Sequence, residues 1–237
     1  MSTLPKRVML KISGEMLGGV PGHGIDPASI ERIAEEIASV HHAGYEIAVV
    51  IGGGNIFRGS QVGSLCMDRA AADYMGMLAT CINGLALQEV IENKCGLRTR
   101  VMTAIHMPEL AEPYIRRKAI KHLMEKRVVI FAGGTGNPLF TTDTAASLRA
   151  REVGADMIYK ATKVDGIYDC DPKKNVNARK FDELTYLDVI SKNLQVMDAT
   201  AITMCMDVNM PIKVFQLGEK GSVLRAITDP TVGTTVR

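Results

Sequence analysis

The chain has 237 residues, of which 46% are hydrophobic and 23% are charged, and its formal net charge is +2 at pH 7. This length and composition are typical of a globular protein with one large domain and a substantial core. A charge so close to zero argues against nucleic acid as the main partner.

Compartment signals favour a cytoplasmic protein. The five cysteines are widely spaced, without a C-x-x-C pair, and their odd number is typical of reduced thiols rather than of a disulfide framework. The residues before the first apolar run lack the hydrophobic stretch of a signal peptide. No apolar run approaches the roughly 18 residues that a membrane span requires. We therefore expect a cytoplasmic protein without a membrane partner.

Short apolar strands alternate with helices along the whole chain. In chain order we expect a strand at 8–12, a helix from Pro27 that ends before Gly44, a strand at 47–51, a helix at 68–93, a strand at 100–104, a basic helix at 113–126, a strand at 128–131, a helix at 144–153, a strand at 155–161, a polar turn region at 169–179, helices near Leu187 and at 199–208, a strand at 211–217 and a helix at 221–227. The long helix carries an apolar stripe of Met75, Leu78, Ile82, Leu85 and Val90.

This alternation predicts an α/β fold with a mostly parallel sheet covered by helices on both faces, because the strands are apolar throughout rather than alternating. No linker, repeat or low-complexity segment divides the chain. We therefore expect a single domain over residues 1–237.

Three of the predicted strands end in glycine turns. We call residues 13–14 the first glycine turn, residues 52–55 the second and residues 133–138 the third. Glycine lets backbone N–H groups approach a phosphate closely, because no Cβ intervenes. One such turn is weak evidence, but the carboxyl ends of parallel strands meet at one edge of a sheet. The three turns together predict one site for several phosphates.

Charged and hydroxyl side chains accompany the turns. Lys11 at the end of the first strand and Arg58 beyond the second turn can neutralise phosphate oxygens. Thr141 and Thr142 precede a helix, whose first amides can bind an anion. Asp143 either caps that helix or holds lysine side chains and helps to organise a metal. Neither a Walker loop (G-x-x-x-x-G-K-[ST]) nor the dinucleotide pattern G-x-G-x-x-G occurs.

Several segments together resemble the bacterial uridylate (UMP) kinases, which have the amino acid kinase fold. They are residues 11–15, 52–59, 72–80, 134–138, 140–143, 160–168 and 197–201. The resemblance extends from about residue 8 to residue 236 and implies a three-layer αβα sandwich. Leu139 is a departure, because an aromatic residue is expected there, and we expect it to alter packing more than chemistry.

The resemblance implies binding sites for ATP and UMP. ATP would contact Lys11, Ile12, Ser13, Gly14, Gly54, Arg58, Thr162, Tyr168 and Asp171. UMP would contact Gly53, Asp73, Thr135, Gly136, Asn137, Pro138, Leu139, Phe140, Thr141 and Thr142. The catalytic set would be Lys11, Lys160, Asp143 and Arg58, with both lysines neutralising the transferred group and Asp143 orienting them.

The implied activity is the ATP-dependent conversion of UMP to UDP in pyrimidine nucleotide biosynthesis. Mg²⁺ would enter with ATP, held mainly by phosphates and water, without a dedicated metal site in the chain. The alternatives are an enzyme of the same fold with a carboxylate or carbamate acceptor, and a non-catalytic nucleotide sensor. The resemblance also implies a homohexamer with GTP as activator and UTP as inhibitor. The basic residues 116–118, Lys121 or Arg127 would contribute to a GTP site.

Overall fold

The computed structural model describes residues 6–20, 22–57, 67–172, 174–194 and 196–237. The strands are β1 (Arg7–Ile12), β2 (Glu46–Ile51), β3 (Thr99–Thr103), β4 (Glu112–Pro113), β5 (Val128–Ala132), β6 (Met157–Thr162), β7 (Ile167–Tyr168), β8 (Lys180–Phe181), β9 (Glu183–Leu184), β10 (Ile212–Gln216) and β11 (Thr234–Val236). The helices are α1 (Pro27–His42), α2 (Arg69–Cys95), α3 (Arg116–Met124), α4 (Thr142–Val153), α5 (Tyr186–Ser191), α6 (Ala199–Met206) and α7 (Ser222–Thr228), with a short 3-10 helix η1 (Gly14–Met16) after β1.

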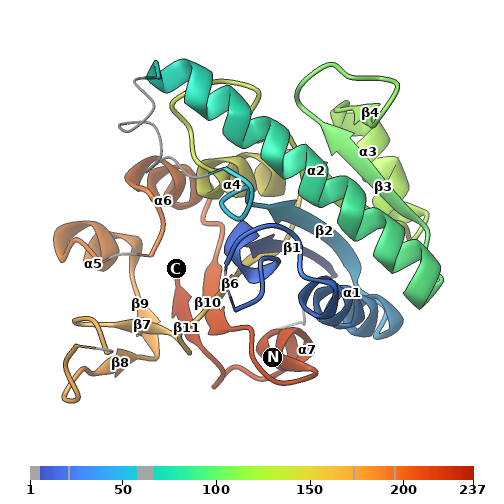
Figure 1. The fold of residues 1–237 in the computed structure, drawn as a ribbon. Coiled ribbons are helices and arrows are strands. Elements are labelled where there is room, and N and C mark those ends of the chain that lie inside the picture. Colours follow the sequence, from blue (N-terminus) through green and yellow to red (C-terminus); the bar gives the residue numbers. More distant parts are fainter. Residues whose placement is uncertain (1–5, 21, 58–66, 173, 195) are drawn as a thin grey trace.

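Nine of these strands form one sheet in the order β4-β3-β5-β2-β1-β6-β10-β11-β9, and β7 pairs with β8 in a separate hairpin (Figure 1). Among the described strands of the large sheet, the pairing of β10 with β11 is the only antiparallel one. The predicted α/β fold with a mostly parallel sheet is confirmed. Because β5, β2 and β1 are adjacent and parallel, the three glycine turns lie side by side at the carboxyl ends of these strands.

Helices cover both faces of the sheet. Successive strand residues point to opposite faces, so Val49 belongs to the core that α1, α2 and α7 cover, whereas Val50 belongs to the core that α3, α4, α5 and α6 cover. This arrangement is the expected three-layer sandwich (Figure 1). No helix in the described ranges is long and apolar enough to cross a membrane.

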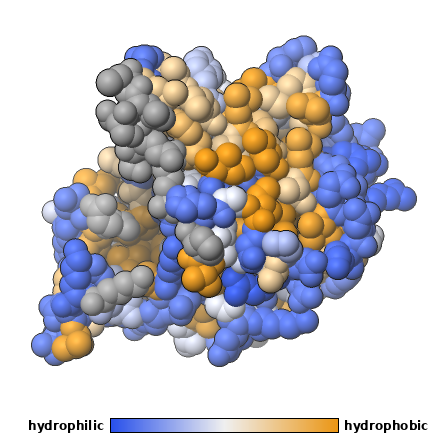
Figure 2. Space-filling model, viewed as in Figure 1, coloured by the Kyte–Doolittle hydropathy of each residue, from blue (hydrophilic) through white to orange (hydrophobic). Residues whose placement is uncertain are grey.

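Helix α2 buries a different face from the one that its apolar stripe indicated. Met75, Leu78 and Ile82 are 37%, 46% and 50% exposed, and hydrophobic side chains lie at the surface over this helix (Figure 2). Most residues on the buried face up to position 84 are small or polar, namely Ala72, Ala79, Thr80, Cys81, Asn83 and Gly84. The larger apolar residues of this face are Met77, Leu87 and Ile91. Small residues are required there because the sheet and the glycine turns approach the helix closely.

The other differences from the sequence prediction concern the ends of two helices and one short strand. Helix α3 begins at Arg116 rather than near residue 113, because Glu112 and Pro113 pair with β3 as β4. Helix α4 begins earlier than predicted, at Thr142, because the Thr141 hydroxyl accepts hydrogen bonds from the amides of Asp143 and Thr144. The antiparallel strand β11 was not predicted from the sequence.

Candidate active site

A largely buried cluster of Lys11, Asp143 and Lys160 lies at the carboxyl ends of the sheet strands, and we call it the lysine–aspartate cluster. Lys11 Nζ is 2.7 Å from Asp143 Oδ1, and Lys160 Nζ is 2.7 Å from Asp143 Oδ2. Lys11 on β1 and Lys160 on β6 are paired in register, so both side chains leave the same face of the sheet. Asp143 meets them from the first turn of α4.

The electrostatics of this cluster suit an anion. Burial acts to raise the pKa of Asp143, but the ammonium groups of Lys11 and Lys160 outweigh it and hold that pKa below its ordinary value. Burial lowers the pKa of Lys160, although Asp143 acts in the opposite direction. One carboxylate faces two ammonium groups, so the cluster can accept the oxygens of a phosphoryl group.

Asp198 lies next to this cluster, and sequence reasoning gave it no role. Its carboxylate accepts hydrogen bonds from the hydroxyls of Thr141 and Thr144 and from the Ala201 amide, and its charge acts on Lys160. Asp198 thereby caps α6 and joins it to the start of α4. The sequence signal was only that of a helix cap, because its threonine partners are more than fifty positions away.

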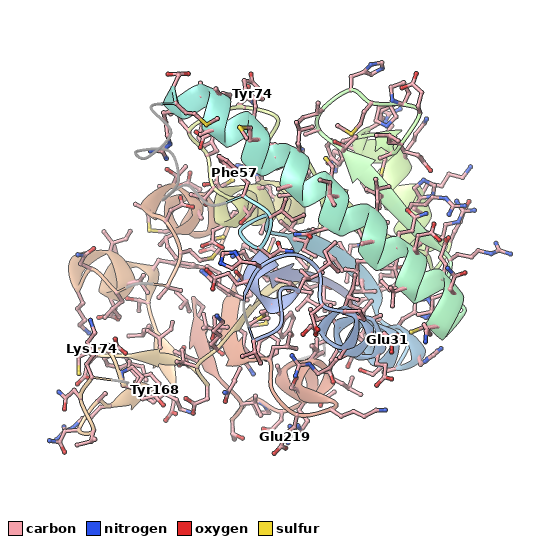
Figure 3. The ribbon with its side chains drawn as sticks, viewed as in Figure 1. Glu31, Phe57, Tyr74, Tyr168, Lys174 and Glu219 are labelled. Carbon is pink, nitrogen blue, oxygen red and sulfur yellow. The ribbon has the colours of Figure 1, made fainter. Side chains whose placement is uncertain are left out.

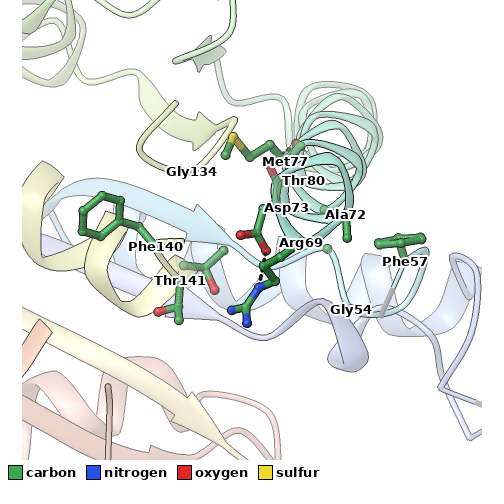
Figure 4. A pocket seen from close by; sticks show the side chains of 13 residues that line it. Gly54, Phe57, Arg69, Ala72, Asp73, Met77, Thr80, Gly134, Phe140 and Thr141 are labelled. Atoms are coloured by element: carbon green, nitrogen blue, oxygen red, sulfur yellow. Dashed lines mark hydrogen bonds and ion pairs between the residues drawn. The ribbon is translucent and has the colours of Figure 1, made fainter. Parts of the chain in front are cut away.

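One cavity, of about 470 Å³, opens between α2, the second glycine turn and the start of α4, and we call it the α2 cavity (Figure 4). The residues predicted to bind UMP that line it are Gly53, Asp73, Phe140, Thr141 and Thr142. Asp73 Oδ2 accepts a hydrogen bond of 2.8 Å from the Leu139 amide, and Oδ1 lies 3.3 Å from Arg69 Nε. The Asp73 carboxylate is therefore held in place at the cavity wall.

The remaining residues predicted for UMP lie in the third glycine turn or directly after it and do not line the α2 cavity. They are Thr135, Gly136, Asn137, Pro138 and Leu139. Thr135 instead borders a smaller depression of about 210 Å³ beside Tyr114 and Arg149. Leu139 adopts a φ of +72° and its side chain is 69% exposed, so the departure noted in the sequence faces outward.

A second cavity, of about 520 Å³, lies beyond the end of β6, and we call it the β6 cavity. The predicted ATP-binding residues Thr162, Tyr168 and Asp171 line it together with Lys160. Figure 3 shows Tyr168 on the β7–β8 hairpin and Phe57, which lines the α2 cavity, near α2, so the two cavities occupy different parts of the molecule. Lys160 lines the β6 cavity and Thr142 the α2 cavity, so the lysine–aspartate cluster lies between them.

The first and second glycine turns are in direct contact. A Cβ on Gly14 would lie 2.6 Å from the Gly52 carbonyl oxygen and 2.7 Å from the Gly54 amide nitrogen, so only glycine fits. Ser13 is the N-cap residue of η1, and Ile12 is buried in the core with its carbonyl accepting from the Gly52 amide. Gly54, predicted for ATP, lines the α2 cavity. Arg58 lies outside the described residues.

The mostly parallel sheet holds a lysine pair, bridged by an aspartate, between two ligand-sized cavities. This arrangement is suited to an enzyme that transfers a phosphoryl group between two bound molecules. The chain belongs to the amino acid kinase family, because the sequence model of that family matches residues 6–216. It is therefore a kinase.

Solved structures of similar proteins agree with this assignment. The chain is 42% identical to a UMP kinase from Bacillus anthracis, with a TM-score of 0.96, covering 99% of this chain and 97% of that one. It is 37% identical to a UMP kinase from Ureaplasma parvum, with a TM-score of 0.92 and 99% of both chains covered. A uridylate kinase from Archaeoglobus fulgidus is 28% identical, with a TM-score of 0.75 and coverage of 97% and 99%. The resemblance that the sequence motifs indicated is confirmed.

Proposed function

We propose that this kinase transfers the γ-phosphoryl group of ATP to UMP, forming ADP and UDP. The observation that carries the proposal is the lysine–aspartate cluster between the α2 and β6 cavities. ATP would place its adenosine in the β6 cavity, and UMP would occupy the α2 cavity. The phosphates of both nucleotides then meet beside the cluster and the glycine turns.

The chemistry requires mainly positioning and charge neutralisation, because phosphoryl transfer passes through a loose transition state. Lys11 and Lys160 would neutralise the transferred group, while Asp143 fixes both ammonium groups. The amides of the glycine turns would donate to phosphate oxygens. An ionised UMP phosphate needs no general base to become a nucleophile.

Mg²⁺ would accompany ATP. Among the described residues no group of three or more His, Cys, Asp or Glu side chains is suited to a metal ion. The two carboxylates at and beside the lysine–aspartate cluster, Asp143 and Asp198, already engage lysine ammonium groups and threonine hydroxyls, respectively. Phosphate oxygens and water would therefore supply most of the Mg²⁺ ligands, and the ion would offset phosphate charge.

Two alternatives are less well supported. An enzyme of the same fold with a carboxylate or carbamate acceptor would have the Asp73 carboxylate in the acceptor cavity, where it would repel such an acceptor. The same carboxylate can accept hydrogen bonds from ribose hydroxyls. A non-catalytic nucleotide sensor has no need for two largely buried lysines held by one aspartate, because burying such charges is costly.

We further propose a cytoplasmic homohexamer that acts in pyrimidine nucleotide biosynthesis, with GTP as activator and UTP as inhibitor. The exposed apolar residues of α2 support association, because large exposed apolar patches mark contact surfaces. Arg127 is a candidate for the GTP site, and its Nη1 lies 2.7 Å from His122 Nδ1. GTP activation that survives Arg127→Ala unchanged would count against that residue.

The proposal is tested by measuring ADP release with ATP, Mg²⁺ and, in turn, UMP, CMP, acetylglutamate, aspartate and carbamate. We expect UMP to be the best acceptor. Lys11→Ala should lower kcat by about 100-fold or more, far more than it changes the fold or UMP affinity, because its ammonium group acts on the transition state. Absence of ADP release with UMP would reject the proposed function, and near-normal turnover in Lys11→Ala would reject the role of Lys11.

A further inference from the structure

Two buried polar side chains on the inner face of α2 contact the glycine turns, and the mechanism above does not use them. Thr80 is 2% exposed and Asn83 is fully buried. They are three positions apart, so they lie on the same face of the helix. Burial of a hydroxyl and an amide is unfavourable unless their hydrogen bonds are made, so their partners indicate what they do.

Thr80 contacts the third glycine turn. The Gly133 amide donates a hydrogen bond of 2.8 Å to Thr80 Oγ1, which in turn donates to the Met77 carbonyl at 2.6 Å. Gly133 begins the turn with a φ of +73°, and the next residue, Gly134, lines the α2 cavity. The Thr80 hydroxyl therefore fixes the backbone at the point where this turn leaves β5 and enters the cavity wall.

Asn83 contacts the second glycine turn through a reciprocal pair of amides. Its Nδ2 donates to the Gly52 carbonyl and to Asn55 Oδ1, both at 2.7 Å. Asn55 Nδ2 donates back to Asn83 Oδ1 at 3.0 Å and to the Gly24 carbonyl at 2.6 Å. All four N–H donors of the two amides are thus used.

The amide pair also reaches the first glycine turn. A Cβ on Gly14 would lie only 2.6 Å from Asn55 Oδ1, so the Asn55 side chain packs directly beneath that turn. Displacement of Asn55 would therefore move both turns that flank the lysine–aspartate cluster. The Asn83 amide on α2 and the Gly24 carbonyl hold the Asn55 side chain in place.

We propose that Thr80 and Asn83 are positioning residues with separate tasks. Thr80 holds the third turn in place for the acceptor, and Asn83, through Asn55 and Gly52, holds the first and second turns where the phosphates meet. Asn83 does not line the α2 or the β6 cavity, whereas Thr80 also lines the α2 cavity, so its effect on the turn has to be measured separately from any contact with the acceptor. The inference rests on the proposed function for the identity of the two substrates. Its physical basis is that misplacement by about 1 Å can reduce a rate by about 100-fold.

The kinetic test uses four variants of the full chain. Thr80→Val, which removes the hydroxyl but keeps the shape, should raise the UMP KM by about fivefold or more and leave the ATP KM unchanged. Thr80→Ser should restore the UMP KM. Asn83→Ala should lower kcat by about tenfold or more. Leu87→Ala truncates a fully buried α2 side chain of the hydrophobic core, so it should lower Tm without changing these constants.

Amide hydrogen exchange provides a readout that needs no substrate. Thr80→Val should accelerate exchange over residues 133–136, and Asn83→Ala over residues 52–55, whereas Leu87→Ala should accelerate neither selectively. Kinetic constants that change no more than in Leu87→Ala, in an enzyme that does phosphorylate UMP, would overturn the inference. If the wild-type protein fails to phosphorylate UMP, the proposed function falls. The exchange pattern then decides the positioning roles, and unchanged turns would overturn them.

Discussion

Lys160 is the residue whose ionisation should be visible in the pH dependence of activity. Burial lowers its pKa below the ordinary lysine value of 10.5. The ammonium group therefore loses its proton at a lower pH than an exposed lysine, and the neutral amine cannot neutralise phosphate charge. We expect kcat/KM for ATP to fall on the alkaline side with an apparent pKa below 10.5. Lys160→Arg should lower the rate and remove this decline, because guanidinium keeps its charge.

Unfolding does not account for that decline. Since the folded-state pKa of Lys160 is lowered, folding favours the neutral form. The contribution of Lys160 to stability therefore rises, rather than falls, as pH increases from the folded-state pKa towards the unfolded one. Circular dichroism at each pH provides the check. An alkaline decline that coincides with loss of structure, or that persists in Lys160→Arg, would contradict the assignment.

Individual site residues differ in how far the sequence could predict them. Lys11 follows from its place at the end of an apolar strand before a glycine, and Asp143 from its place at a helix start. Lys160 was found only through the family resemblance. Asp198 and Asn83 received no role, because each acts through hydrogen bonds to residues far away in the chain. A single sequence carries no local signal for such pairings.

At the scale of elements, the contact between the second glycine turn and α2 allows no side chain. A Cβ on Gly53 would lie 2.7 Å from the Gly76 carbonyl oxygen and 2.8 Å from the Ala79 Cβ. Gly53→Ala should therefore displace the turn or the helix, lowering stability by about 1–3 kcal/mol and weakening UMP binding. Thermal unfolding and isothermal titration with UMP measure the two effects.

The matched control is Gly84→Ala, elsewhere on α2. Its Cβ would meet side-chain carbons of Val101, Ile130 and Ala132 at an ordinary 3.5 Å. We expect unchanged UMP binding and a stability equal to or above that of the wild type, because alanine favours the helix. Equal effects of the two substitutions would show that close packing at Gly53 is not what positions the turn.

The same contact explains where element prediction failed. Periodicity located α2 but not its buried face, because the sheet and turns select small residues there and leave Met75, Leu78 and Ile82 outside. Strands of two or three residues, such as β4 and β11, are too short to give an alternating pattern. The long apolar strands were predicted well, because burial on both faces fixes their composition.

At the scale of the whole molecule, α2 has two distinct faces. On the inner face, Asp73 and Thr80 line the α2 cavity, and Thr80 and Asn83 form hydrogen bonds with the glycine turns. The outer face presents the apolar residues Leu78 and Ile82 to solvent. If the chain forms the proposed hexamer, a neighbouring copy on the outer face would bear on the same helix that holds the active-site turns. Association and catalysis would then share one element.

The outer face of α2 is the surface on which we expect copies of the chain to meet. The double substitution Leu78→Glu and Ile82→Glu places two charges on it, and desolvating them at an interface is unfavourable. We expect multi-angle light scattering after gel filtration to give a smaller assembly than for the wild-type protein, with unchanged circular dichroism. Leu187→Glu on α5, also an exposed apolar position, should leave the mass unchanged. An unaltered mass in the double variant would exclude this face as a subunit contact.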